Sequence, residues 1–195
     1  MNLPNLLTLS RIPLMFIIVG LMRAGFTGAA SLAFILFVVA GLTDWLDGYL
    51  ARKMKLVSNF GILMDALTDK ILMLGLMIAL VEIGKVHIFL VLLILGREFM
   101  ITGLRLVAAT KGVVMSAESA GKQKTVTQIL AVGAFLLADV IRLDVGRLSW
   151  SMAPDAALWL DWLGRILFWI CVVMTLYSGA KYFRKYGQLV FLDNR

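Results

Sequence analysis

Four aspartates stand close together in a chain that is otherwise strongly apolar: Asp44, Asp47, Asp65 and Asp69. Charged side chains are costly at membrane depth, so acids in such a chain are candidates for a functional site. Residues three or four apart share one face of a helix, so each pair could point its carboxylates to the same side, and two helix ends could bring all four together. Divalent cations relieve the repulsion among carboxylates, and ligation by oxygen alone favours Mg²⁺ or Mn²⁺ over zinc. The pattern therefore predicts a site for hard metal ions.

The alternative for these acids is a structural role as helix caps and surface ion pairs, for example Asp69 with Lys70. Capping carboxylates prefer the start of a helix, where the helix dipole favours a negative charge. Asp44 and Asp47 instead follow an apolar run and would end a helix that leaves the membrane. Their position therefore favours a ligand role.

The composition of the chain indicates an integral membrane protein. Its 195 residues are 61% hydrophobic and only 16% charged, and the mean hydropathy is +0.92. With spans of about 20 residues, helices that cross the bilayer would use most of this length, so we expect one membrane domain over residues 1–195. The net charge of +7 could suggest nucleic acid, but in so apolar a chain a basic excess is typical of loops that face anionic lipid headgroups. No nucleic-acid partner is expected.

Six apolar runs divide the chain. They cover approximately residues 12–21, 28–42, 61–80, 86–109, 126–140 and 157–178. We predict an all-α fold of six transmembrane helices, with a short N-terminal interfacial helix in residues 1–11. The connections are expected to be a tight turn at residues 51–60, a polar loop at 111–128 and an irregular segment at 141–158, followed by an extramembrane tail. The tight turn would make the second and third helices antiparallel neighbours, with both acid pairs at one membrane face.

Lys and Arg residues set the expected orientation. When the acid face is placed in the cytoplasm, 14 of the 19 Lys and Arg residues lie on the cytoplasmic side and 5 on the other. The positive-inside rule then places the predicted site at the cytoplasmic face of the membrane.

The acids belong to a longer pattern, D-x2-D-G-x2-A-R-x8-G-x3-D-x3-D. Its fixed positions are Asp44, Asp47, Gly48, Ala51, Arg52, Gly61, Asp65 and Asp69. Eight fixed positions over 26 residues make a chance match very rare. In this pattern the sequence resembles the CDP-alcohol phosphotransferase family, with no departure at a fixed position. The resemblance implies transfer of a substituted phosphoryl group from a CDP-linked lipid to an alcohol, with release of CMP.

The resemblance also implies roles for individual residues. Asp44, Asp47 and Asp65 would hold two metal ions, Mg²⁺ or Mn²⁺, and Asp69 would complete their shell and deprotonate the attacking hydroxyl. The residues that would contact the CDP-lipid are Gly48, Arg52 and Ser58, with Asn5 and Thr8 from the first helix. A homodimer in the bacterial cytoplasmic (inner) membrane, in contact with membrane lipids, is implied as well.

Three shorter segments bear on the acceptor alcohol. P-N-L-L-T-L-S-R, G-R-E-F-M-I-T-G-L-R and G-K-Q-K-T-V-T-Q resemble the phosphatidylglycerophosphate synthase branch of the family. That branch implies CDP-diacylglycerol as donor and glycerol 3-phosphate as acceptor. The residues that would hold the acceptor phosphate are Arg105, Lys122, Lys124 and Thr125. The alternatives are that these cations are ordinary cytoplasmic charges, and that the acceptor is phosphatidylglycerol, inositol phosphate or serine.

Arg97 and Glu98, within the second of these segments, point to different sides of a helix, and we expect no ion pair between them. Two hypotheses of another class also remain. A divalent-cation transporter would distribute its acids across the depth of the bilayer, whereas these cluster at one face. A lipid-binding scaffold without activity is disfavoured by the complete motif.

Overall fold

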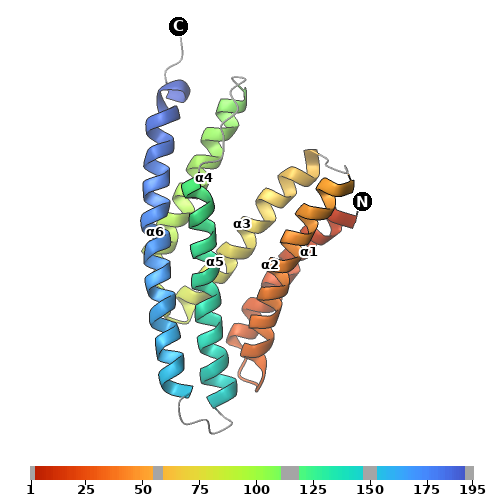
Figure 1. Ribbon diagram of the computed structural model, residues 1–195, viewed down its shortest axis with the longest axis vertical. Helices are drawn as coiled ribbons and strands as arrows, with labels where there is room; N and C mark the ends of the chain where they lie inside the picture. Colours follow the sequence, from red (N-terminus) through yellow and green to blue (C-terminus); the bar gives the residue numbers. More distant parts are fainter. Residues whose placement is uncertain (1–2, 55–58, 111–118, 147–152, 192–195) are drawn as a thin grey trace.

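The computed structural model describes residues 3–54, 59–110, 119–146 and 153–191 of the chain. These residues form helices and short connections, with no strand among them, so the all-α prediction is confirmed for this part of the chain (Figure 1). The helices are α1 (Leu3–Arg23), α2 (Ala29–Met54), α3 (Asn59–Glu82), α4 (Ile88–Thr110), α5 (Ser119–Asp139), the π-helical segment η1 (Val140–Val145) and α6 (Ala153–Phe191).

The helices pack as two connected groups. Helices α5 and α6 lie along each other over much of their length, and α4 packs against α6. On the other side of the molecule, α1 packs against both α2 and α3, which run in opposite directions as the sequence predicted (Figure 1). The buried apolar side chains take members from all six α-helices, among them Ile18, Phe37, Leu76, Ile94, Phe135 and Phe168.

Small residues allow close approach at two of these contacts. A Cβ at Gly75 of α3 would lie 2.2 Å from the Sδ atom of Met15 in α1. A Cβ at Gly164 of α6 would lie 2.9 Å from the ring of Phe135 in α5. Since apolar burial does not drive helices together in a lipid environment, tight packing at small residues is a common means of holding such helices.

The outer surface is rich in large apolar side chains, as a lipid-facing surface must be. Phe16, Phe89 and Trp159 are 66%, 66% and 76% exposed. Within the described residues, Gln123–Val145 and Pro154–Gly187 are helical stretches long and apolar enough to cross a membrane, and Ala29–Thr43 is a shorter apolar stretch.

The succession of helices places the segments of interest at one end of the molecule. The first turns of α1, α3 and α5 and the last turns of α2, α4 and α6 all lie toward the end drawn uppermost in Figure 1. We call this the site end and the opposite end the far end.

Several predicted boundaries were wrong because helices extend further than the apolar runs. The expected N-terminal interfacial helix is continuous with the first run in α1, which also contains Pro13. Part of the predicted loop at residues 111–128 is helical, because α5 begins at Ser119. Polar Lys and Gln residues are good helix formers, and the hydroxyl of Thr127 is satisfied by the carbonyl oxygens of Gln123 and Lys124, at 3.0 and 2.8 Å.

Two other connections are also more helical than expected. The irregular segment at residues 141–158 contains η1 and the start of α6 at Ala153. The tail forms the end of the same helix, which continues to Phe191.

At the far end, α3 is terminated by a glycine. Gly84 has a φ of 74°, a conformation that residues with a Cβ rarely adopt. The N–H of Gly84 donates to the carbonyl oxygen of Val81 at 3.0 Å, and that of Lys85 to Leu80 at 2.9 Å. This pair of bonds is a Schellman motif, which ends the helix and turns Lys85 back toward the bundle.

Lys85 then joins a network of ion pairs at the far end. Its Nζ atom lies 2.7 Å from Oδ1 of Asp139 and 2.6 Å from Oδ1 of Asp161. Arg142 of η1 also pairs with Asp161. The side chains of Lys85, Asp139 and Asp161 are only 8%, 15% and 11% exposed. The network therefore links the α3–α4 turn to α5, η1 and α6.

Asp144 of η1 holds the start of α2. Its Oδ1 accepts a hydrogen bond from the N–H of Gly28 at 2.7 Å, and its Oδ2 accepts from the N–H and the hydroxyl of Ser31 at 2.8 and 2.7 Å. A carboxylate at a helix N-terminus satisfies free N–H groups and interacts favourably with the helix dipole. Here that carboxylate comes from a distant part of the chain.

Candidate active site

The predicted acid pairs lie on two helices that meet at the site end. Asp44 and Asp47 belong to the C-terminal half of α2, and Asp65 and Asp69 to the first turns of α3. The helical spacing on which the prediction depended is therefore confirmed for both pairs. The structure does not describe the side chains of these four aspartates. Among the side chains that it does describe, no group of three His, Cys, Asp or Glu residues is placed to bind a metal ion. The metal site stays a prediction.

The candidates for binding the nucleotide are placed only by their helices. Asn5 and Thr8 lie in the first turns of α1, and Gly48 and Arg52 lie in α2 beyond Asp47. Ser58 lies outside the described residues. The positions in α1 and α2 belong to the site end, and the contacts that the sequence predicts for all five residues stay predictions.

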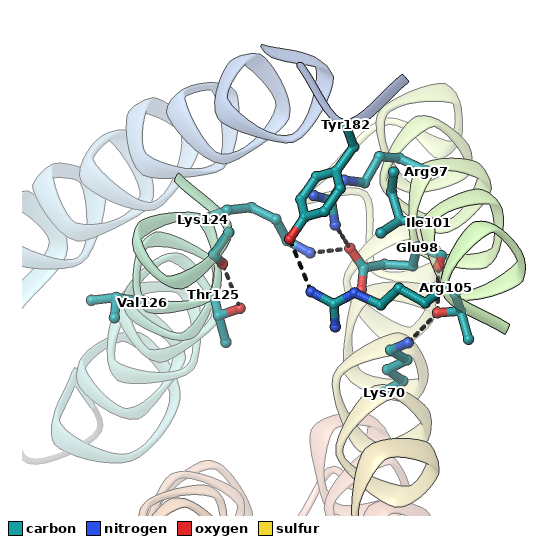
Figure 2. A pocket seen from close by; sticks show the side chains of 11 residues that line it. Lys70, Arg97, Glu98, Ile101, Arg105, Lys124, Thr125, Val126 and Tyr182 are labelled. Carbon is teal, nitrogen blue, oxygen red and sulfur yellow. Dashed lines mark hydrogen bonds and ion pairs between the residues drawn. The ribbon is translucent and has the colours of Figure 1, made fainter. Parts of the chain in front are cut away.

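A pocket of about 440 Å³ opens at the site end among α3, α4, α5 and α6 (Figure 2). It brings together three of the four residues predicted for the acceptor phosphate: Arg105, Lys124 and Thr125. The fourth, Lys122, lies in α5, but its side chain is outside the description. The other lining residues are Lys70, Arg97, Glu98, Ile101, Thr102, Gly121, Val126 and Tyr182. We call this space the cationic pocket.

Glu98 lies at the centre of the charges in this pocket. Its Oε1 atom accepts a hydrogen bond from Nη1 of Arg97 at 2.8 Å and another from Nζ of Lys124 in α5. The expectation that Arg97 and Glu98 would not pair was wrong. Adjacent residues diverge by about 100° around a helix, but the long arginine side chain spans that angle. The pair holds α4 and α5 together through Lys124.

Arg97 fits against α6 because small residues face it. Its Nη2 atom donates a hydrogen bond to the hydroxyl of Ser178 at 2.8 Å. A Cβ at Gly179 would lie 3.1 Å from Cγ of Arg97, which is tighter than ordinary van der Waals contact. The arginine therefore occupies space that a larger residue at position 179 would fill.

Tyr182 of α6 organises the other side of the pocket. Its hydroxyl accepts a hydrogen bond from Nη2 of Arg105 at 2.9 Å. The guanidinium carbons of Arg97 and Arg105 lie 5.8 and 5.6 Å from the centre of its ring, within the range of cation–π attraction. The side chain is only 1% exposed. Tyr182 thus fixes Arg105 by two different interactions.

Lys70 connects the cationic pocket to the acid-bearing helix. Its Nζ atom donates a hydrogen bond to Oγ1 of Thr102 at 2.5 Å, and the same hydroxyl donates to the carbonyl oxygen of Glu98 at 2.7 Å. Lys70 directly follows Asp69 in α3. The backbone of the predicted general base is therefore one residue from the pocket wall.

The charge balance of the cationic pocket suits an anion. Among the lining residues that the structure describes, one carboxylate, Glu98, faces four cations, which leaves a net of three positive charges. The cations are Lys70, Arg97, Arg105 and Lys124. Guanidinium and ammonium groups form their strongest hydrogen bonds with phosphate and carboxylate oxygens. A phosphate monoester with two negative charges would neutralise most of this surplus.

The site residues predicted from the sequence did not include the pocket's other charged residues or its tyrosine: Lys70, Arg97, Glu98 and Tyr182. The second motif segment contains Arg97 and Glu98, so their charge within an apolar run was a usable signal. Tyr182 carried no such signal, because an aromatic residue near the end of a transmembrane helix is usual.

A smaller, more apolar cavity of about 260 Å³ adjoins the cationic pocket. The two share Lys70, Glu98, Lys124 and Thr125, and the remainder of the second cavity is lined mainly by apolar residues of α3 and α4 such as Leu74 and Phe99. A polar space next to an apolar one can receive a molecule that has both a charged and a hydrocarbon part.

Comparison with known proteins agrees with this geometry. The family described as CDP-alcohol phosphatidyltransferase matches residues 1–177. A protein of Bacillus subtilis (strain 168) named CDP-diacylglycerol–glycerol-3-phosphate 3-phosphatidyltransferase is 41% identical, with 99% of each chain covered. Proteins of the same name from Rickettsia typhi and Salmonella choleraesuis are 34% and 32% identical, covering 94% and 93% of this chain and 96% and 92% of their own. The chain belongs to the CDP-alcohol phosphatidyltransferase family.

Proposed function

We propose that this chain transfers the phosphatidyl group of CDP-diacylglycerol to glycerol 3-phosphate, giving phosphatidylglycerophosphate and CMP. Family membership supports the transfer of a phosphatidyl group. The names of relatives that are similar over nearly the whole chain support the donor and the acceptor.

The observation that carries the proposal is the cationic pocket beside Asp69. Its surplus of positive charge favours an anionic acceptor such as glycerol 3-phosphate over serine, which carries no net charge. Arg105, Lys124 and Thr125, with Lys122 from the same turn of α5, would bind the acceptor phosphate. Because Lys70 lines the pocket and directly follows Asp69 in α3, a phosphate bound there would lie near the segment that bears Asp65 and Asp69.

The proposed reaction is a displacement at phosphorus. The primary hydroxyl oxygen of glycerol 3-phosphate forms a bond to the phosphorus that carries diacylglycerol, and the bond from this phosphorus to the oxygen of CMP breaks. Asp69 takes the proton of the attacking hydroxyl, and CMP leaves with the electron pair. A positioned general base typically contributes about 10²- to 10⁴-fold to such a rate.

The acids of α2 and α3 suit divalent metal ions by their chemistry. Asp44, Asp47 and Asp65, with Asp69, offer only carboxylate oxygens from two antiparallel helices, a donor set that fits Mg²⁺ or Mn²⁺. Two such ions, when bound, would neutralise charge on both phosphates of the donor.

The donor nucleotide would lie over the start of α1 and the end of α2. Arg52 is the best candidate for a diphosphate contact, since a guanidinium binds phosphate through two parallel hydrogen bonds. Gly48 allows a ligand close to the backbone, and Ser58, Asn5 and Thr8 complete the proposed contacts. The apolar cavity next to the cationic pocket is compatible with a lipid substrate.

We further propose a single membrane domain over residues 1–195 with six transmembrane helices and its site at the cytoplasmic face. Helices α1 to α4 contain 21, 26, 24 and 23 residues. At about 1.5 Å per residue each exceeds 30 Å, the thickness of the hydrocarbon core. The excess of Lys and Arg at the site end supports the orientation. A homodimer in the bacterial inner membrane is proposed on the family resemblance.

One assay tests the reaction. Protein purified in detergent would be mixed with CDP-diacylglycerol, Mg²⁺ or Mn²⁺, and glycerol 3-phosphate, inositol phosphate, phosphatidylglycerol or serine, and the release of CMP followed. We expect release with glycerol 3-phosphate that stops on addition of EDTA and returns with excess metal. If no acceptor supports CMP release, the proposed transferase activity is wrong, whereas release with inositol phosphate alone would overturn only the choice of acceptor.

A further inference from the structure

We propose that Glu98 is a specificity-determining residue that accepts a hydrogen bond from the middle hydroxyl of the acceptor, the one between the phosphate-bearing and the reacting carbons. The cationic pocket would then select polyol phosphates over phosphate monoesters that lack this hydroxyl. This inference rests on the proposed function, because it assumes that the pocket binds the acceptor.

The first step is that Glu98 is held as an ionised acceptor. Its Oε1 atom receives hydrogen bonds from Arg97 and Lys124, which come from two different helices. Both bonds join a carboxylate to a cation and are therefore stronger and more rigid than bonds between neutral groups. The orientation of the carboxylate is thus set before a ligand arrives.

The second step is that the carboxylate remains accessible. The side chain of Glu98 keeps 22% of its surface exposed, and this surface lies in the cationic pocket. Figure 2 shows the carboxylate between Lys124 and Arg105, with its second oxygen directed to the Arg105 side. An ionised carboxylate has about four acceptor positions on its two oxygens, and the two bonds above use positions on Oε1 alone.

The third step is that a phosphate and a carboxylate need different partners. The acceptor phosphate is attracted to Arg105, Lys124 and Lys70, and Glu98 repels it. A hydroxyl group has the opposite preference, because it can donate to the carboxylate. A ligand with a hydroxyl on the carbon next to its phosphate-bearing carbon can therefore satisfy the cations with its phosphate and Glu98 with its hydroxyl.

The fourth step concerns which hydroxyl is available. In the proposed reaction the terminal hydroxyl is directed to Asp69, beside Lys70 on the α3 wall. The middle hydroxyl is left without a role in the chemistry. Glu98, on the α4 wall between Arg105 and Lys124, lies on the side where the phosphate would bind. The middle hydroxyl is therefore the natural partner of Glu98.

The test compares two acceptors in several variants. 3-Hydroxypropyl phosphate keeps the chain length, the phosphate and the reacting hydroxyl of glycerol 3-phosphate but lacks the middle hydroxyl. We expect the wild-type kcat/KM for glycerol 3-phosphate to exceed that for 3-hydroxypropyl phosphate by about 10- to 100-fold. This ratio corresponds to the free energy that a hydrogen bond to a charged group contributes. In Glu98→Ala this ratio should fall to within about 3-fold of unity, and Glu98→Gln, which keeps an acceptor oxygen without the charge, should lie between.

A matched variant separates specificity from positioning. Lys124→Met removes one of the two ion pairs of Glu98 but leaves the carboxylate held by Arg97. It should therefore lower activity with both acceptors and preserve the ratio. A ratio that stays at the wild-type value in Glu98→Ala, whatever the remaining rate, would overturn the proposal and make Glu98 a positioning residue only. For any variant without turnover, the dissociation constants of the two phosphates, measured by calorimetry on the purified protein, give the same comparison. A wild-type enzyme that does not use glycerol 3-phosphate would instead contradict the proposed function.

Discussion

Tyr182 and Arg105 are joined across 2.9 Å, with the hydroxyl of the tyrosine accepting a hydrogen bond from Nη2 of the arginine. The bond ties α6 to α4 near the site end, and the tyrosine ring reinforces it by lying 5.6 Å from the guanidinium carbon. Because Tyr182 is buried, it cannot easily change its position. The direction of Arg105 in the cationic pocket is therefore imposed by a helix that contributes no acid to the predicted metal site.

Tyr182→Phe should weaken acceptor binding without affecting the fold. The variant keeps the aromatic ring but loses the hydrogen bond to a charged group, and we expect the KM for glycerol 3-phosphate to rise about 10-fold with kcat largely unchanged. Steady-state measurement of CMP release checks this. Tyr177→Phe is the control, since Tyr177 lies on the same helix and is 65% exposed. An equal rise in KM in both variants would contradict the role of Tyr182.

Substitutions of Arg105 should separate charge from geometry. Arg105→Lys keeps the charge but loses the forked guanidinium, and we expect the KM for the acceptor to rise about 10-fold. Arg105→Gln loses both and should raise it about 100-fold. Arg184→Gln, which removes an exposed arginine from α6, should leave KM within a factor of two. The KM for CDP-diacylglycerol should not change in any of the three, and a parallel change would place Arg105 at the donor instead.

Asp69→Asn should abolish turnover while leaving binding of the donor largely intact. The amide cannot accept the proton of the attacking hydroxyl, and loss of a general base lowers the rate by about 10²- to 10⁴-fold. Rates come from CMP release, and metal-dependent binding of CDP-diacylglycerol from a separate equilibrium measurement. Asp155→Asn, an exposed acid at the start of α6, is the control. If donor binding is lost together with turnover, Asp69 serves mainly as a metal ligand.

Asp161→Asn should destabilise the protein by weakening the ion-pair network at the far end. Asp161 pairs with both Lys85 and Arg142, and its side chain is 11% exposed. Loss of this carboxylate leaves Asp139 alone to balance Lys85, which is only 8% exposed, and Arg142. We expect the free energy of unfolding to fall by about 2 kcal/mol. Thermal unfolding in detergent measures this as a lower Tm.

Glu82→Gln provides the comparison for this stability effect. The pair of Glu82 with Arg23 spans 3.1 Å, and the two side chains are 48% and 61% exposed. Exposed pairs contribute about 0 to 1 kcal/mol, so its Tm should hardly change. The KM of the remaining folded Asp161→Asn enzyme should equal that of the wild type. A Tm decrease as large in Glu82→Gln would show that burial does not explain the effect.

Much of the fold could be predicted from the sequence because apolar runs of span length are a strong local signal. The boundaries of the helices could not be predicted, because a helix can continue beyond the end of its apolar run. Ser119 lies in a polar segment, where Lys and Gln residues continue a helix as well as apolar ones do. Pro13 illustrates the converse, since α1 continues through a residue that usually ends helices.

The candidate site divides in the same way. The spacing of Asp44, Asp47, Asp65 and Asp69 is a property of two helices and was visible in the sequence. The pairing of Glu98 with Lys124 and of Arg105 with Tyr182 joins residues 26 and 77 positions apart. Such contacts depend on how α4, α5 and α6 pack, and a single sequence carries no direct signal of that packing.

The carboxylate of Asp144 fixes the axial position of α2 along the long axis of the molecule. Three hydrogen bonds hold the first residues of this helix to η1, and Asp44 follows the start of α2 by 15 residues, or about 22 Å along a straight helix. Since a helix is stiff along its axis, the axial position of Asp44 and Asp47 is set by a contact at the far end of the molecule. The α5–α6 hairpin supplies Lys124 and Tyr182 at its site end and Asp144 at its far end. The packed helices α5 and α6, together with η1, therefore position both a wall of the cationic pocket and the acids of α2.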